Sequence, residues 1–219
     1  MNANVVLEQR PGLGQYELPQ TDYPKLHLGC FDQPLAGWVN TDITPHIWVA
    51  KIPFAAKLLH SAGRISSKRL AQHQAGIFRQ IQYLNLSKRF PYPSNFFGAV
   101  FTSHVLEHLY PAVSIHCLGE CLRVLRPDGV LRIAVPDLDR MVREYDSGDP
   151  ESFLQEVFQY GVGADKNSHH WHYNYTNLRS RLLRIGFYRV ERCDYRVGAC
   201  PDVQTIDSRP TSLFIEALK

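Results

Sequence analysis

Short strand-like runs alternate with amphipathic stretches along the chain. Runs of strand length occur at residues 25–30, 38–43, 81–84, 99–103, 130–135, 188–195 and 212–218. Between them, apolar residues at helical spacing predict helices over 111–125, 138–145, 151–160 and 178–185, the last closed by Gly186. This alternation predicts an α/β fold, a three-layer sandwich in which helices cover both faces of a mostly parallel sheet.

The length and composition fit one globular domain. The chain has 219 residues, of which 44% are hydrophobic and 21% charged, and a domain of this size can bury a substantial core. We expect an N-terminal arm at 1–23 and one domain at 24–219. The N-terminus lacks the layout of a signal peptide, and no apolar run is long enough to span a bilayer. The five cysteines lack metal-ligand spacing, which favours a cytoplasmic location.

A basic stretch stands out within the net charge of +3. Residues 43–106 contain eight Lys and Arg but neither Asp nor Glu, which favours an anionic partner over a neutral one. Most of this excess lies in residues 44–80, which we interpret as an insertion with two short helices, the second starting near Ser66. It could be a lid over the acceptor, a homodimer contact, a membrane-surface patch or simply a solvated face.

A glycine and an acid follow the first two predicted strands. In open α/β sheets the ligand lies beyond the carboxyl ends of the strands, where Gly29 and Asp42 are expected. A carboxylate there can accept both ribose hydroxyls, which points to an adenosine-containing cofactor. No Gly-x-Gly-x-x-Gly follows, and Asp32 stands where a pyrophosphate would lie. These residues disfavour a dinucleotide and suit a cofactor that carries a sulfonium instead.

Several longer motifs resemble class I S-adenosylmethionine-dependent methyltransferases. They are Leu26-His-Leu-Gly-Cys30, Gly37-Trp-Val-Asn-Thr-Asp-Ile43, the run from Phe90 to Leu109, the run from Leu122 to Asp137, and Leu182-Leu-Arg-Ile-Gly-Phe187. The nearest branch is a group of small methyltransferases linked to polysaccharide or glycan modification. The resemblance implies a Rossmann-like, seven-stranded sheet with an antiparallel strand near the C-terminus, and S-adenosyl-L-methionine as the cofactor.

The resemblance also implies a set of cofactor-binding residues. They are Gly29, Cys30, Phe31, Asp42, Ile43, Asn85, Leu86, Ser103 and His104. The chain departs from the family at two of them. Phe31 replaces a glycine, which at positive φ costs roughly 1–2 kcal/mol, and its ring would either crowd the cofactor or stack on the adenosine. Asn85 replaces an Asp, although its carbonyl could still accept from the adenine amine.

Histidines provide the candidate catalytic groups, which are His104, His169 and His170. A neutral His titrates in the range needed to take a proton from an acceptor hydroxyl. His104, Glu107 and His108 share one face of a helix predicted after the fourth strand. They could form an acid/base or divalent-metal site, or fasten the helix to nearby loops; we assign no metal from the sequence. His169 and His170 lie in a loop that could instead be a packed lid.

The sequence therefore predicts methyl transfer to an oxygen of a sugar, a glycan or another anionic small acceptor. Nucleic acid is a less favoured acceptor. The alternative is a methyltransferase-like binding protein that has lost turnover and holds an anionic partner. A nucleotide-dependent oxidoreductase is disfavoured because the glycines of the dinucleotide motif are missing.

Overall fold

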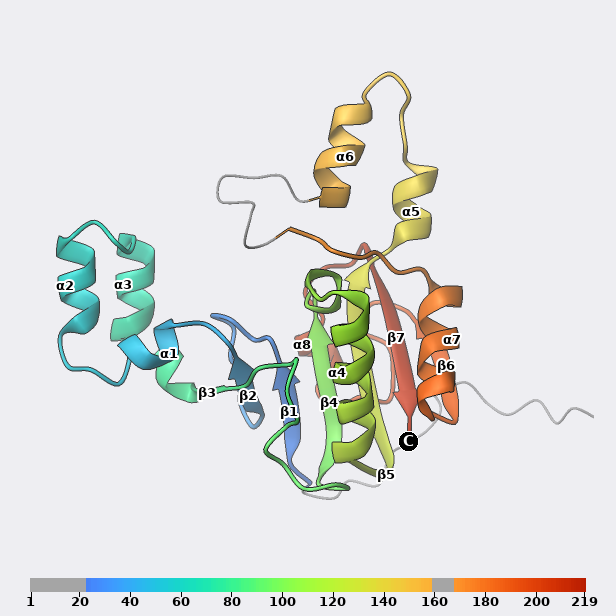
Figure 1. Ribbon diagram of the computed structural model, residues 1–219, viewed down its shortest axis with the longest axis horizontal. Coiled ribbons are helices and arrows are strands. Elements are labelled where there is room, and N and C mark those ends of the chain that lie inside the picture. The colour runs from blue at the N-terminus through green and yellow to red at the C-terminus, as the bar shows by residue number, and fades with distance from the viewer. Residues whose placement is uncertain (1–22, 159–167) are drawn as a thin grey trace, which may run out of the picture.

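A seven-stranded sheet in the order β3-β2-β1-β4-β5-β7-β6 forms the centre of the molecule (Figure 1). The computed structural model describes residues 23–158 and 168–219, so the expected N-terminal arm lies outside it except for Tyr23. The strands are β1 (Lys25–Leu28), β2 (Val39–Asp42), β3 (Ile81–Tyr83), β4 (Phe97–Ser103), β5 (Leu125–Pro136), β6 (Arg189–Cys193) and β7 (Ser212–Leu218). Strands β1 to β5 pair in parallel, and β7 pairs antiparallel with β5 and β6. The predicted fold class is confirmed.

The helices follow the predicted pattern, with one exception. They are α1 (His46–Val49), α2 (Ala55–Ser61), α3 (Ser67–Gln74), η2 (Ile77–Gln80), η3 (Leu106–His108), α4 (Pro111–Val124), α5 (Leu138–Arg143), α6 (Pro150–Phe158), α7 (Tyr175–Ile185) and α8 (Val203–Ile206). Ser66 caps α3 as expected, accepting a hydrogen bond from the Arg69 amide. The helix expected to carry His104 is wrong, because only the 3₁₀ turn η3 forms there. His104 precedes that turn at φ 53°, outside helical geometry.

Helices α4 and α7 cover one face of the sheet (Figure 1). Their apolar positions fall at helical spacing, so one stripe of each helix faces the strands. Leu118 and Cys121 of α4 and Leu182 of α7 are fully buried there, packed in one cluster with Leu131 of β5. This cluster is the main core, and it holds the central strands that carry the site.

The opposite face is covered in a different way. The connection from β1 to β2 spans only residues 29–38 and contains no helix, although parallel strands usually need a dozen or more residues and a crossover helix. Residues 194–211, between β6 and β7, lie on this face instead. Cys200 and Ile206 from that segment pack with Trp38 and Phe101 in a second buried cluster. Residues 194–211, called the late segment below, thus fill the space beside β1.

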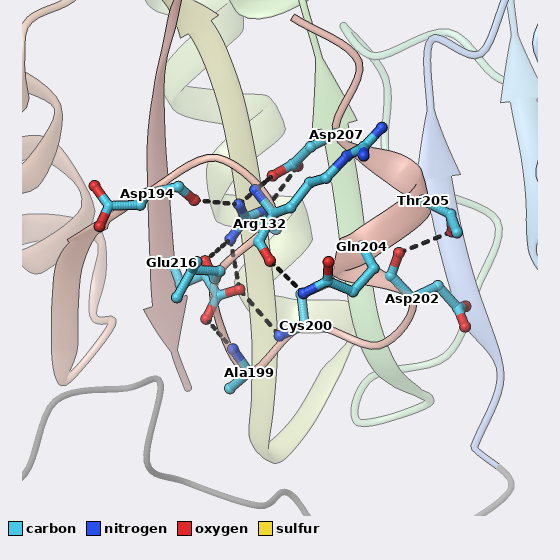
Figure 2. A network of polar contacts seen from close by, with 11 residues as sticks. Arg132, Asp194, Ala199, Cys200, Asp202, Gln204, Thr205, Asp207 and Glu216 are labelled. Carbon is cyan, nitrogen blue, oxygen red and sulfur yellow. Dashed lines mark hydrogen bonds and ion pairs between the residues drawn. The ribbon is translucent and has the colours of Figure 1, made fainter. Parts of the chain in front are cut away.

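A buried ion network fixes this late segment to the sheet (Figure 2). The guanidinium of Arg132 in β5 lies 2.5 Å from Asp207 and 2.9 Å from Glu216, and all three side chains are fully buried. It also donates to the carbonyl oxygens of Asp194 and Val197. Burial alone would lower the pKa of Arg132, but the two carboxylates raise it above its ordinary value. Arg132 therefore stays protonated within the network.

Gly198 lets the chain pass close to this network. A Cβ atom added at Gly198 would lie 2.2 Å from a carboxylate oxygen of Glu216 and 2.6 Å from the Arg132 guanidinium. The residue also has a φ of 157°. A side chain would therefore displace the ion pairs, and the late segment needs glycine at this position.

The basic insertion projects beyond the β3 edge of the sheet. Figure 1 shows α2 and α3 side by side there, away from α5 and α6. Trp48, Ile52, Phe54 and Leu58 are each at least half exposed. No helix within residues 23–158 and 168–219 combines the length and apolar character needed to cross a membrane. The insertion as a separate unit or lid stays a prediction.

Candidate functional site

A cavity of about 390 Å³ opens at the carboxyl ends of β1 and β4. This volume lies in the range of small-molecule sites. Its wall comes from β1 and the turn after it, from β4 and its end, and from the late segment between β6 and β7. The lining residues are His27, Gly29, Cys30, Phe31, Asp32, Gln33, Leu35, Phe101, Ser103, His104, His108, Thr205, Ile206, Ser208 and Arg209.

The turn after β1 is tightly constrained. Gly29 has a φ of 67°, and a Cβ atom there would lie 2.4 Å from a methyl group of Val105. Phe31 also has a positive φ, 44°, so the residue that replaces the family glycine keeps the conformation of a glycine. The Phe31 amide donates to one carboxylate oxygen of Asp42 at 3.0 Å, and the Thr44 amide donates to the other at 2.7 Å. Asp42 thus fixes the turn that forms the cavity wall.

Phe31 lines the cavity, and 44% of the residue is exposed. The Arg69 guanidinium of α3 stacks over it, 4.5 Å from the ring centroid. Arg69 and Gln72 also hold Asp32, at 3.1 and 2.8 Å from its carboxylate. The insertion therefore touches the site through one helix. None of residues 44–80 lines this cavity.

The sequence-predicted cofactor residues fall into two groups. Gly29, Cys30, Phe31, Ser103 and His104 line the cavity, whereas Ile43, Asn85 and Leu86 do not, and Asp42 reaches it only through its bond to Phe31. Contact of that second group with a cofactor stays a prediction.

Two of these residues have environments that bear on their predicted roles. The side-chain oxygen of Asn85 already accepts from the amide and hydroxyl of Ser87, at 2.9 and 2.8 Å. Burial, helped by the charge of Asp42, raises the pKa of Cys30 to about 12, so its thiol is neutral and no nucleophile.

A second cavity, of about 490 Å³, adjoins the first. Helices α5 and α6, rather than the basic insertion, form its outer wall. Its lining residues are His104, Pro136, Arg140, Ser152, Gln155, Glu156, His169, Arg209, Thr211 and Ser212. His104 and Arg209 line both cavities, so the two spaces meet at these side chains.

His104 is held from two sides at this junction. Its Nδ1 atom lies 3.1 Å from a carboxylate oxygen of the fully buried Glu107, and its Nε2 atom lies 2.8 Å from the Ser212 hydroxyl. The contact with Glu107 lacks the alignment of a hydrogen bond. A carboxylate accepts but does not donate, which favours the ring proton on Nδ1. Nε2 is then an acceptor facing the cavities.

The other candidate histidines lie in different surroundings. His169 lines the second cavity and is 7% exposed. Burial lowers its pKa to about 4 although the Glu107 charge acts in the opposite direction, so the ring is neutral near pH 7. His170 is exposed, stacks on Tyr110 at 4.1 Å and lines neither cavity. The structure therefore places His104 at the junction and His169 in the second cavity, but His170 in neither cavity.

Sequence reasoning missed the wall contributed by the late segment. Thr205, Ser208 and Arg209 come from between β6 and β7, more than 160 residues after Gly29. They carry no motif, and the short helix α8 has too few residues to show a period. The buried charges Asp207 and Glu216 were the available signal, because an acid within an apolar strand such as 212–218 needs a basic partner.

One part of the chain matches a known family. Residues 55–133, from α2 to β5, match the family model described as a methyltransferase domain. The matched range covers less than half of the chain. The match, together with the strand order, supports an enzyme that transfers a methyl group from S-adenosylmethionine as its cofactor. Because the matched range begins after Asp42, it says nothing of the turn at Gly29.

Solved structures share the fold of this chain. A methyltransferase from Thermotoga maritima has a TM-score of 0.51 at 13% identity, over 92% of this chain and 84% of that one. One from Mesorhizobium loti has a TM-score of 0.50 at 16% identity, over 90% and 91%. Both are described as dependent on S-adenosylmethionine. At such identity the likeness extends to the fold alone.

The residues of the first cavity suit this cofactor. Its wall combines the backbone of the turn after β1 with the carboxylate of Asp32, the guanidinium of Arg209 and the apolar ring of Phe101. The wall thus contains acidic, basic and apolar groups that suit the amino-acid end, the ribose and the base of S-adenosylmethionine.

Proposed function

We propose that the chain transfers the methyl group of S-adenosylmethionine to a hydroxyl oxygen of an anionic small acceptor, such as a sugar or glycan. The observation that carries this proposal is the meeting of two cavities at His104, with a carboxylate behind the ring. The first cavity holds the cofactor, which supplies an electrophilic methyl group on a sulfonium. The second, beneath α5 and α6, holds the acceptor.

In this proposal the cofactor lies along the turn after β1. Backbone groups of Gly29, Cys30 and Phe31 contact its methionine and ribose, and Asp42 accepts the ribose hydroxyls with the lone pairs left by its two amide contacts. Ser103 lies near the reacting methyl. Binding here is mainly a matter of alignment, which contributes most of the rate in a direct methyl transfer.

His104 acts as the general base in this proposal. Its Nε2 atom takes the proton of the acceptor hydroxyl in the position now occupied by the Ser212 hydroxyl, or through that hydroxyl. The acceptor oxygen bonds to the methyl carbon as the carbon–sulfur bond breaks, and the electron pair stays on sulfur. Glu107 stabilises the imidazolium, because its carboxylate lies 3.1 Å from Nδ1.

Arg209 is the basis for an anionic acceptor. It lines both cavities, and no ion pair involves it among the residues that the structure describes. Arg140 also lines the second cavity but is paired with Glu144 and Glu156. A free guanidinium at the junction suits a carboxylate or phosphate on the acceptor.

The proposal is tested by separating cofactor binding from turnover. Calorimetry should detect S-adenosylmethionine binding to the wild type and to His104→Gln alike, and Asp42→Asn should weaken it at least tenfold. Methyl transfer to a panel of acidic and neutral sugars should fall 10²–10⁴-fold in His104→Gln. His116→Gln, an exposed change on α4, is the matched control. Cofactor binding without transfer to any acceptor would favour the inactive binding protein, and no binding would reject both.

A further inference from the structure

A cluster of two imidazoles and a carboxylate lies beside the junction of the cavities. Glu107, His108 and His169 each offer one ligand atom, and these atoms lie within 4.8 Å of one another. Glu107 and His108 belong to η3, and His169 comes from the segment before α7. Ligand atoms bound to one tetrahedral ion at 2.0–2.2 Å lie roughly 3.4 Å apart, so small side-chain movements would bring these three atoms around an ion.

Two members of the cluster are buried without hydrogen-bond partners. Glu107 is fully buried, yet neither carboxylate oxygen has a hydrogen-bond partner among the described residues, and one only lies 3.1 Å from Nδ1 of His104. Both ring nitrogens of His169 are likewise unpartnered in the part of the chain that the structure describes. A buried carboxylate is costly unless it is paired or binds a metal. A cation among these atoms would satisfy all three side chains.

The third member is oriented as a ligand. The Nδ1 atom of His108 lies 3.3 Å from the Ser168 carbonyl oxygen. A carbonyl only accepts, so this contact fixes the proton on Nδ1 and leaves the Nε2 lone pair free. Metal-bound histidines are commonly held through the second ring nitrogen in this way.

The backbone holds the two halves of the cluster together. The amides of His170 and Trp171 donate to the Glu107 carbonyl oxygen at 2.7 and 3.2 Å. His169, which immediately precedes His170, is thereby held against η3. Its ring lies 4.9 Å from that of His108. Main-chain hydrogen bonds thus fix Glu107 and His169 next to each other.

We infer that Glu107, His108 and His169 bind a divalent transition-metal ion of the zinc class. Two imidazoles and one carboxylate form a three-ligand set, which leaves a coordination position open. His169 lines the acceptor cavity, so that position is available to an acceptor oxygen. The role of the ion rests on the proposed function: it would orient the acceptor hydroxyl and favour loss of its proton to His104. Metal binding itself does not depend on methyl transfer.

Zn²⁺ and Co²⁺ titrations of the full chain, freed of metal with a chelator and without S-adenosylmethionine, test the inference. We expect one equivalent to bind and to raise the Tm. Glu107→Gln and His169→Asn should each weaken Zn²⁺ binding at least tenfold. His116→Asn removes an exposed imidazole from α4 and should bind as the wild type does. The absorption bands of bound Co²⁺ should show low coordination number in the wild type.

Two results would overturn the inference. One is the absence of saturable Zn²⁺ and Co²⁺ binding to the wild type. The other is binding that Glu107→Gln and His169→Asn leave unchanged or that His116→Asn reduces equally. Because the folded state of each variant is checked by circular dichroism, and S-adenosylmethionine affinity is measured separately in chelator, failure here is distinguishable from failure of the proposed function.

Discussion

Replacing Arg132 by Met should destabilise the protein severely. The change leaves Asp207 and Glu216 fully buried without their cation (Figure 2). Removing one partner of a buried ion pair costs about 3–5 kcal/mol, and here two carboxylates lose the same partner, so we expect about 5 kcal/mol. Total stabilities are typically about 5–15 kcal/mol. Urea unfolding of the full chain measures the loss.

A compensated variant separates charge from packing. Arg132→Met combined with Asp207→Asn and Glu216→Gln removes all three charges, so it should recover at least half of the lost stability. Arg179→Met, an exposed change on α7, is the control and should stay within about 0.5 kcal/mol of the wild type. A cost below about 1 kcal/mol for Arg132→Met, or no recovery in the triple variant, would refute the role assigned to the network.

Two further predictions concern the wall of the first cavity. Gly29→Ala should cost about 2–4 kcal/mol of unfolding free energy, because backbone strain at positive φ adds to the close contact with Val105. In urea unfolding, a second change, Val105→Ala, should recover only the part of this cost that comes from the close contact. Full recovery would contradict the backbone strain. His27 should lower the stability of the protein in acid. Burial lowers the pKa of its imidazole in the folded state to about 4, although the hydrogen bond to Asn40 acts in the opposite direction. As the pH falls from 6.5, the imidazole is therefore protonated in the unfolded chain but not in the folded one. The free energy of unfolding should then drop by at most about 3 kcal/mol between pH 6.5 and 4, and a slope that His27→Asn leaves unchanged would assign the effect to other groups.

The sequence predicted the central strands most readily because β4 and β5 consist largely of apolar residues. Leu131, Ile133 and Val135 alternate with residues that are also buried, so a two-sided strand was evident. The start of β5 was placed too late, since Arg126-Pro-Asp-Gly129 has turn chemistry while the structure extends the strand to Leu125 with a shifted register. Turn-forming residues can thus occupy an irregular strand end.

The site was predicted less completely than the sheet. Gly29, Phe31 and Ser103 follow strands directly, so the position of each in the chain sets its place in space. The helix predicted through His104 failed, because its backbone adopts φ 53° before a single 3₁₀ turn. His104 and Glu107 still meet, since a spacing of three suits one turn of either helix type. The pairing of His108 with His169 depends on tertiary contacts and has no local signal.

The route taken by the chain after β1 affects the order in which the cavity forms during synthesis. With no crossover helix at 29–38, one wall of the first cavity consists of residues 205–209, anchored by Asp207 and Glu216 to β5. During synthesis, β1 to β5 can emerge and pair while this wall is still missing. The pocket is completed only when the last strand inserts between β5 and β6. Cofactor capture on the ribosome therefore has to wait for almost the whole of this sequence.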